Sequence, residues 1–317
     1  MSSSTEQVDP IVHRLAVATC CVALLPIAIG TLVTTLRAGM AFADWPTSDG
    51  HSMLLYPWLN DVRNIDRFTE HGHRLAGMVI GITSIALVAV AYLRERQAWV
   101  RMYTILILVA VIAQGLLGGA RVLMDASQLA MVHSISGAVF FVMCAVFALI
   151  TGRKWRGQSV ARHRLSTMAN VAVLILPLLI LMQYWLGGMF RHLGRMMFEH
   201  LAGAVLVAFV GLVCSVLLIR CGSSPLRRSG LFILGALLIQ LGLGAAAWVT
   251  KLNVPGLGWV AATGSPASVV FRSMHTVGGI LLLTSSVLAA VHVVRQMSWY
   301  TGTSPVNARA AAKEGFA

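Results

Sequence analysis

Charge is what this sequence has least of. Only 11% of its 317 residues are Asp, Glu, Lys or Arg, whereas about a quarter are charged in an ordinary soluble protein. The hydrophobic fraction is 57% and the mean hydropathy is +0.79. Apolar runs of about 20 residues, enough to cross ~30 Å of hydrocarbon, recur along the whole chain. The composition therefore excludes a soluble globular domain and predicts an integral membrane protein.

Cysteine pairs suited to a disulfide or a redox motif are also lacking. Cys20, Cys21, Cys144 and Cys214 fall inside apolar runs, Cys221 falls in a basic loop, and there is no Cys-x-x-Cys. None lies in a loop that we place on the outer side of the membrane, so we expect no structural disulfide.

The first apolar run, residues 15–33, lacks a small-residue cleavage site and continues into a polar loop. A secretory signal peptide would end at such a site. We therefore expect this run to be a retained helix.

Eight spans are predicted, and they must be helices because lipid cannot satisfy backbone polar groups. The expected fold is an all-α membrane protein with polar tails at 1–14 and 297–317. The predicted spans are 15–36, 69–93, 101–121, 128–151, 167–190, 196–220, 229–250 and 270–295.

The formal net charge of +13 raises the question of nucleic acid binding. The basic residues sit between apolar runs rather than on a soluble face, so they indicate membrane topology and not nucleic acid binding. Most of the 24 Lys and Arg residues lie on the side of the two tails, and most acidic residues lie on the other. Both termini are therefore expected in the cytoplasm.

A motif repeats in alternate predicted helices. The pattern Gln-x-x-Leu-Gly-small occurs at 114–119, 183–188 and 240–245, and Ile29-Gly30-Thr31 is a degenerate echo. His73-Arg-Leu-Ala-Gly77 likewise resembles His200-Leu-Ala-Gly203. This predicts two four-helix halves, 15–151 and 165–296, related by a pseudo-two-fold axis along the membrane normal. The alternative is that small residues recur only because they allow close helix packing.

Four histidines occupy equivalent positions near the expected outer surface. His73, His133, His200 and His275 each fall in the first turns of an even-numbered helix. Each is followed after three or four residues by glycine, which lies on the same helical face and would leave room for a flat macrocycle. The alternative role of these glycines, Gly77, Gly137, Gly203, Gly278 and Gly279, is helix packing alone.

Histidines at membrane depth are candidate functional residues, and imidazole is a common axial ligand of heme iron. Copper and zinc sites usually add Cys, Met or carboxylate ligands, which favours heme over a bare metal. Arginines at the same level could hold heme propionates or could snorkel to the interface. They are Arg74, Arg121, Arg191, Arg195 and Arg272.

Glu70 begins the second predicted span and shares a helical face with His73. It could act as a base or electrostatic stabiliser beside heme, or it could favour the helix dipole and pair with Arg74. Glu199 is a weaker candidate. His71 points away from His73 and is expected to be a packing or interfacial residue. The other histidines, His13, His51, His163, His192 and His292, fall in loops or at helix ends.

Several of these motifs together resemble the heme A synthase family. The resemblance rests on Phe68-Thr-Glu-His-Gly-His-Arg74, Gln114-x-x-Leu-Gly-Gly119, His200-Leu-Ala-Gly203, His275 and the run from Ala38 to Pro46. It covers residues 15–296. One departure is that the first outer loop has no cysteine pair, which some members of the family carry.

The resemblance implies an eight-helix duplicated bundle that oxidises the C8 methyl group of heme O to the formyl group of heme A. It implies a heme b cofactor held by His200 and His275. The substrate, heme O, would bind near His73, His133 and Arg74, with Glu70 in the chemistry. It also implies action on the outer side of a bacterial-type inner membrane, with a heme O synthase and an electron donor as candidate partners; the sequence leaves the oligomeric state open.

Two other functions remain open from the residues. A diheme b-type electron carrier would need the same histidines but no catalytic carboxylate. A heme-handling protein would release heme unchanged. Glu70 discriminates between the carrier and the synthase.

Overall fold

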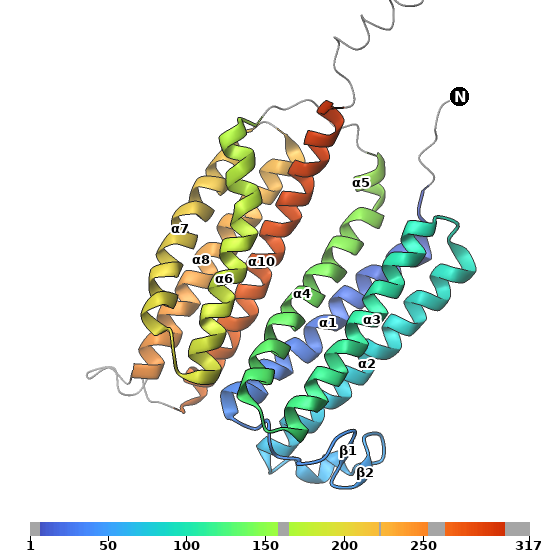
Figure 1. Ribbon diagram of the computed structural model, residues 1–317, viewed down its shortest axis with the longest axis vertical. Helices are drawn as coiled ribbons and strands as arrows, with labels where there is room; N and C mark the ends of the chain where they lie inside the picture. The colour runs from blue at the N-terminus through green and yellow to red at the C-terminus, as the bar shows by residue number, and fades with distance from the viewer. Residues whose placement is uncertain (1–6, 158–164, 222, 253–263, 302–317) are drawn as a thin grey trace, which may run out of the picture.

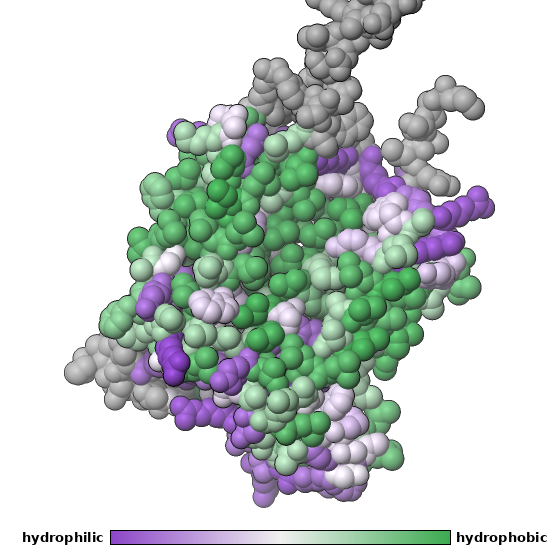
Figure 2. Space-filling model, viewed as in Figure 1, coloured by the Kyte–Doolittle hydropathy of each residue, from purple (hydrophilic) through white to green (hydrophobic). Residues whose placement is uncertain are grey.

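The computed structural model describes residues 7–157, 165–221, 223–252 and 264–301. Eight helices in these ranges are long and apolar enough to cross a membrane, so the chain is an all-α, multi-pass membrane protein. Figure 2 shows hydrophobic residues over the middle of the visible face and hydrophilic residues toward its two ends. The predicted spans are confirmed as α1 Pro10–Leu36, α2 Ile65–Arg94, α3 Ala98–Leu123, α4 Ser127–Thr151, α6 Thr167–Leu193, α7 Met197–Arg220, α8 Ser224–Leu252 and α10 Pro266–Thr301.

Several helices extend beyond the predicted boundaries because polar residues cap or continue them. Helix α1 begins at Pro10 and not at residue 15, since the Asp9 side chain accepts a hydrogen bond from the Ile11 N–H at 2.8 Å and proline suits the first helical turn. Residues 10–14 are thus helical rather than part of a tail. At the other end, α10 continues past residue 295 to Thr301.

The long helices form two groups of four. Helices α1, α2, α3 and α4 pack in a ring, and α6, α7, α8 and α10 form a second ring of the same connectivity (Figure 1). The two groups meet through α1 and α4 on one side and α6 and α10 on the other. This grouping agrees with two four-helix halves; the pseudo-two-fold axis stays a prediction.

Both rings are held together by apolar side chains. The fully buried residues include Leu87, Ile107, Phe147, Leu176 and Leu218, while many large apolar side chains face outward, as expected of a surface solvated by lipid. All five cysteines are free, in agreement with the expectation of no disulfide.

The segment between α1 and α2, residues 37–64, is the α1–α2 loop, and it lies at one end of the first ring (Figure 1). It contains a short hairpin, β1 Thr47–Ser48 and β2 His51–Ser52, and a 3-10 turn at Trp58–Asp61. We call this end of the molecule the loop end. Helix α1 begins and α10 finishes at the opposite end, where the short α5, Arg153–Gly157, also lies.

Candidate heme site

The four singled-out histidines form two facing pairs. The imidazole centroids of His73 in α2 and His133 in α4 are 6.2 Å apart, with ring planes at 83°. Those of His200 in α7 and His275 in α10 are 6.3 Å apart at 86°. Each ring of four helices therefore contributes one pair, with nearly identical geometry. His73 and His275 lie in the third helical turn, one turn deeper than expected, because α2 and α10 begin four residues before the predicted starts.

The separation in both pairs suits two imidazoles that share one metal atom. A metal–imidazole bond is about 2.0 Å long. With roughly 1.1 Å more from the nitrogen to the ring centre, trans ligands on one metal have centroids about 6.2 Å apart. The observed 6.2 and 6.3 Å match this value.

A glycine of the preceding long helix lies against each imidazole, in α1, α3, α6 and α8, a contact that the sequence patterns did not predict. A Cβ atom on these glycines would come within 2.9–3.2 Å of the histidine Cε1 atom, so only glycine lets the ring lie this close to the helix. The contacts are Gly30 with His73, Gly118 with His133, Gly187 with His200 and Gly244 with His275. Three of these glycines belong to the repeated Gln-x-x-Leu-Gly motif, which could have signalled the contact.

The glycines that follow the histidines serve another purpose than the one expected. Gly203 and Gly278 make room for the side chains of Gln183 and Gln240 of the repeated motif, and Gln114 lies in ordinary contact beside Gly137. Among these glycines, only Gly77 has open space beside it. In α1, the position that corresponds to the motif glutamines is occupied by Pro26, so no glutamine is available to fill this space. The expected space for a macrocycle beside these glycines is therefore wrong at three positions, where a side-chain amide takes it.

The two pairs differ in how their histidines are held. The Gln183 amide donates to the His200 carbonyl at 2.7 Å and lies 3.1 Å from His200 Nδ1, and the Gln240 amide lies 3.5 Å from His275 Nε2. In the first pair, both polar atoms of Gln114 are buried without a hydrogen-bond partner. In the second pair His200 is thus held by a glutamine hydrogen bond of regular length and Gln240 lies at a longer distance from His275, whereas the side chain of Gln114 makes no hydrogen bond in the first pair.

The histidines also present unsatisfied polar atoms. His73 Nδ1, His133 Nδ1 and His275 Nδ1 are buried without a regular hydrogen bond. A backbone carbonyl four residues before each contacting glycine interacts with each ring, at Pro26, Gln114, Gln183 and Gln240. A metal-bound imidazole commonly directs its second N–H at such a carbonyl, so this environment suits a metal ligand.

The donor set favours heme over a bare ion. Within the described ranges, no group of three or more His, Cys, Asp or Glu side chains is placed to hold a metal ion. Zinc and copper sites normally take three or four protein ligands. A pair of imidazoles without further protein ligands suits a metal that brings its own planar ligand, which is the case for heme iron.

Glu70 is held by an arginine and by the loop. Both side chains are buried, and Arg74 Nη2 donates to Glu70 Oε1 at 2.8 Å. The other carboxylate oxygen accepts the N–H groups of Ala41 and Phe42 at 2.7 and 3.3 Å. The ion pair that the non-catalytic interpretation of Glu70 required is therefore present.

Arg74 also anchors the loop. Its Nη1 atom donates to the carbonyls of Asp44 and Thr47 at 2.9 and 2.5 Å and to Ser48 Oγ at 3.4 Å. These contacts occupy the guanidinium group that we expected to hold a propionate, so its contact with heme stays a prediction.

Further contacts fix the loop over the first histidine pair. The Arg121 side chain donates to the Gly39 carbonyl, and the Trp45 ring packs directly on Gly119, next to the glycine that contacts His133. The Phe42 ring lies between Arg67 and Arg74, whose guanidinium carbons are 4.8 and 5.1 Å from its centroid.

Asp44 stiffens the loop from within. Its carboxylate accepts the N–H groups of Asp49 and Gly50 at 3.0 and 2.9 Å. Burial raises the pKa of this carboxyl, but the hydrogen bonds from Gly50 and Thr47 and the charge of Arg74 outweigh burial and lower the pKa below its ordinary value.

The other arginines have distinct environments. Arg191 does not snorkel: Nη2 donates to the Thr31 carbonyl and to Thr35 Oγ1 at 2.7 and 2.8 Å, and Nη1 donates to Thr276 Oγ1. Arg195 is exposed at the end of α6. No contact of these side chains tests the expected binding of propionates.

The remaining histidines are not members of the two pairs. His71 is fully buried under the α1–α2 loop, in agreement with a packing role, and lies 3.0 Å from Ser48 Oγ. His13 pairs with Thr151 at the opposite end, His51 is in β2, and His192 ends α6. His292 lies 5.0 Å from the Trp155 ring, and His163 lies outside the described residues.

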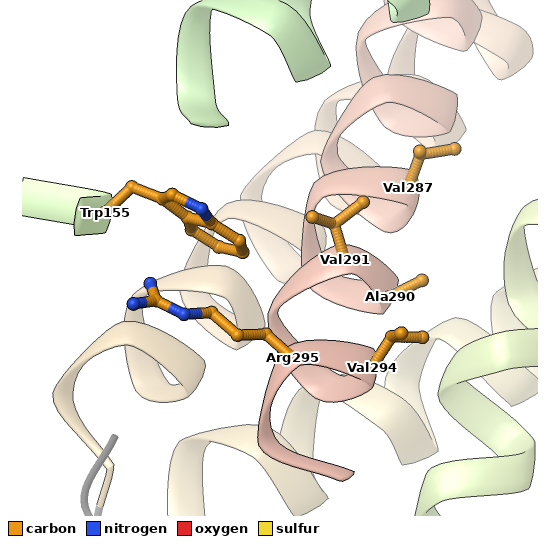
Figure 3. A pocket seen from close by; sticks show the side chains of 6 residues that line it. All are labelled: Trp155, Val287, Ala290, Val291, Val294 and Arg295. Carbon is orange, nitrogen blue, oxygen red and sulfur yellow. The ribbon is translucent and has the colours of Figure 1, made fainter. Parts of the chain in front are cut away.

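A pocket at the end opposite the loop contributes nothing to this site. Figure 3 shows Trp155 of α5 facing Val287, Ala290, Val291 and Val294 along α10, with Arg295 beside the indole. The Arg295 guanidinium carbon lies 4.3 Å from the Trp155 ring centre. The lining has no metal-ligating side chain, and it begins twelve residues along α10 from His275, about 18 Å at 1.5 Å per residue.

Comparison with models of protein families shows to which family the chain belongs. The family model of the cytochrome oxidase assembly protein matches residues 13–198, more than half of the chain. The chain belongs to this family. A comparison with curated proteins found no match. Membership confirms the resemblance to the heme A synthase family and places this assembly protein in cytochrome oxidase assembly and heme A synthesis, which implies oxidoreductase activity.

The family match covers the first site but not the second. It includes the α1–α2 loop, Glu70, His73 and His133, and it ends two residues before His200. The second pair of the assembly protein is therefore recognised from its own geometry, which repeats that of the first.

Proposed function

We propose that the chain is a heme A synthase, which oxidises the C8 methyl group of heme O to a formyl group. The observation that carries the proposal is the pair of opposed imidazoles in each half, at 6.2 and 6.3 Å, in a member of this family. An enzyme that oxidises one heme with the help of another needs two such places.

The second pair is assigned to heme b and the first to heme O. Gln183 holds His200 by a hydrogen bond and Gln240 lies beside His275, which suits a cofactor that stays bound. His73 and His133 lack this brace, which suits a substrate that must be released after reaction. Heme b supplies one-electron redox chemistry when bound.

The chain's own residues orient the substrate and exclude water. The α1–α2 loop covers the end of the first ring, and Glu70, Arg74 and Arg121 hold it there. A closed loop lowers the local dielectric, so charges around the reacting methyl group act more strongly.

Glu70 is proposed as the catalytic carboxylate, in the form of an electrostatic stabiliser rather than a free base. Three hydrogen bonds hold the two oxygens of Glu70, which leaves little room for an incoming proton and suits a group that acts by its position. A carboxylate at this position, one helical turn from His73, would favour positive charge that develops at the substrate.

The proposed location is the bacterial inner membrane, with both termini in the cytoplasm and the heme sites near the outer face. All four histidines lie in the first three turns of α2, α4, α7 and α10, which begin toward the loop end (Figure 1), and α1 starts at the opposite end, where the basic segments gather. A heme O synthase would deliver the substrate, and an electron donor would act at the same face.

The main alternative is a diheme electron carrier of the b type. It shares both histidine pairs but has no need of a buried carboxylate tied to a loop over one of them. A heme-handling protein without chemistry would likewise not need one histidine pair that is held by glutamine and a second pair that lacks this contact. The loop and Glu70 therefore favour the synthase.

Pigment analysis of cells supplied with heme O tests the proposal. The wild type is expected to produce heme A, and Glu70→Ala and His73→Ala are expected to lower its amount at least tenfold. His13→Ala, at the opposite end of the bundle, is the control and should retain the wild-type amount. Wild-type protein that binds heme b but never yields a hydroxymethyl or formyl heme would overturn the proposal.

A further inference from the structure

The pocket at the end opposite the loop lies between the two helical groups. Trp155 belongs to α5, which follows α4 of the first group, whereas the facing wall belongs to α10 of the second group (Figure 3). The volume is about 350 Å³. We call this pocket the α5–α10 groove, and it is lined by Trp155, Val287, Ala290, Val291, Val294 and Arg295. A ligand in the groove would touch both groups at once.

The α10 wall of the groove is apolar and open to lipid. Val287, Ala290, Val291 and Val294 recur at helical spacing, so they form one stripe that runs about 10 Å along the helix. Val294 is 51% exposed, and the membrane-spanning part of α10 continues to Met297. An apolar stripe that is exposed at membrane depth contacts hydrocarbon, so the groove suits an acyl chain.

A cation stands at the end of this stripe. The Arg295 guanidinium carbon lies 4.3 Å from the Trp155 ring centre, and the His292 ring lies 5.0 Å from the same indole. Tryptophan and arginine near the end of a membrane span are typical of the head-group region. Stacking uses the face of the guanidinium group, whereas oxyanions bind at its edge, so Arg295 can contact the indole and a phosphate together.

The surroundings of the groove are positively charged. Between Asp125 and Glu314 the sequence has a single acidic residue, Glu199, which lies in the first turn of α7 toward the loop end. In the described part of the chain, the carboxylates opposite the loop are Asp9 and Glu95 of the first group, and both accept hydrogen bonds there. The cations at this end include Arg153, Lys154, Arg156, Arg220, Arg227, Arg228 and Arg295. Such an excess of one sign attracts a negatively charged ligand.

We propose that the α5–α10 groove binds an anionic phospholipid, with an acyl chain along the α10 stripe and the phosphate at Arg295. Basic pockets between membrane helices recognise acidic head groups in this way. A zwitterionic phospholipid also has a phosphate, but its own cation offsets the charge, so the basic surroundings favour a lipid of net negative charge. The proposal concerns lipid binding and does not depend on the proposed heme A synthesis.

Native mass spectrometry of the purified full chain in detergent measures the binding. The protein is titrated with dioleoyl phosphatidylglycerol and, in parallel, with dioleoyl phosphatidylcholine, which has the same chains and no net charge. The wild type is expected to bind the first phosphatidylglycerol at least fivefold more tightly. Arg295→Gln should weaken phosphatidylglycerol binding about fivefold and remove most of this preference. Arg228→Gln removes an exposed arginine at the start of α8, outside the groove, and should bind as the wild type does.

A second variant tests the apolar wall without a change of charge. Ala290→Leu fills part of the groove and should weaken the binding of both lipids several-fold. Equal affinity of the wild type for the two lipids, or an equal loss in Arg295→Gln and Arg228→Gln, would overturn the proposal in favour of diffuse attraction. If Arg295→Gln fails to fold, Ala290→Leu decides alone, and an unchanged phosphatidylglycerol affinity there overturns it.

Discussion

Arg191 of α6 donates a hydrogen bond to the carbonyl of Thr31 in α1, at 2.7 Å, and so ties the two helical groups together. Thr31 follows the glycine that contacts His73. The same guanidinium donates to Thr276, which follows His275. One side chain thus lies between residues adjacent to both histidine pairs.

Loss of this arginine is expected to loosen the junction between the groups. Arg191→Met leaves the Thr31 carbonyl and the Thr35 and Thr276 hydroxyls without their charged donor, and removal of a buried charged partner costs about 3 kcal/mol. Thermal unfolding of the purified protein in nanodiscs measures this loss. Arg195→Met, at an exposed position in the same segment, is the control, and an equal loss in both variants would contradict a specific role of Arg191.

Alanine in place of the glycines that contact histidine should displace the imidazoles. In Gly244→Ala, the new Cβ would lie 3.0 Å from His275 Cε1, so bound heme b in the purified protein should fall several-fold. Pyridine hemochrome spectra measure the heme. Gly242→Ala on the same helix meets open space and should keep the heme, with a gain of about 0.5 kcal/mol in helix stability. Equal heme loss in both would show that the contact is unimportant.

The glutamine brace should matter only in the second pair. Gln183→Leu removes the amide that holds His200, so the midpoint potential and spectrum of heme b should change. Gln114→Leu removes an amide without partners and should leave heme b unaltered. Spectroelectrochemical titration of the two variants measures the difference. A heme b that shifts in Gln114→Leu and not in Gln183→Leu would reverse the assignment of the two sites.

The Glu70–Arg74 pair should behave as a unit. Either Glu70→Gln or Arg74→Met leaves a buried charge unpaired, at a cost of about 3 kcal/mol, and the double variant should lose less than the sum of the two. Denaturant unfolding of the four proteins provides the double-mutant cycle. Additive losses would mean that the two side chains are not coupled.

Acid should open the α1–α2 loop through Asp44. Folding lowers the pKa of this carboxyl, so its contribution to loop stability is present above its ordinary value of 3.8 and disappears as the pH falls through the lower folded value. Hydrogen exchange at the Asp49 and Gly50 amides should therefore accelerate on acidification beyond the intrinsic pH effect. Asp44→Asn should exchange faster at neutral pH and show no such added acceleration.

Much of the architecture could be predicted from the order of residues alone. An apolar run long enough to cross a bilayer forms a helix, because its backbone polar groups cannot bond to lipid. Eight spans and their approximate bounds therefore follow from the composition along the sequence. The equivalence of the four histidines followed from a repeat, and the assembly of His73 with His133 and of His200 with His275 agreed with the family resemblance.

The contacts between helices were decided only by the tertiary structure. A helix face has a period of 3.6 residues, but nothing in that period tells which neighbour fills the space beside a glycine. Gln183 therefore took the place expected for a macrocycle at Gly203, and Gly187 came to lie against His200. In the same way, Arg191 could be placed near the membrane surface from its position, whereas its link between α1 and α10 depends on how the two rings of helices meet.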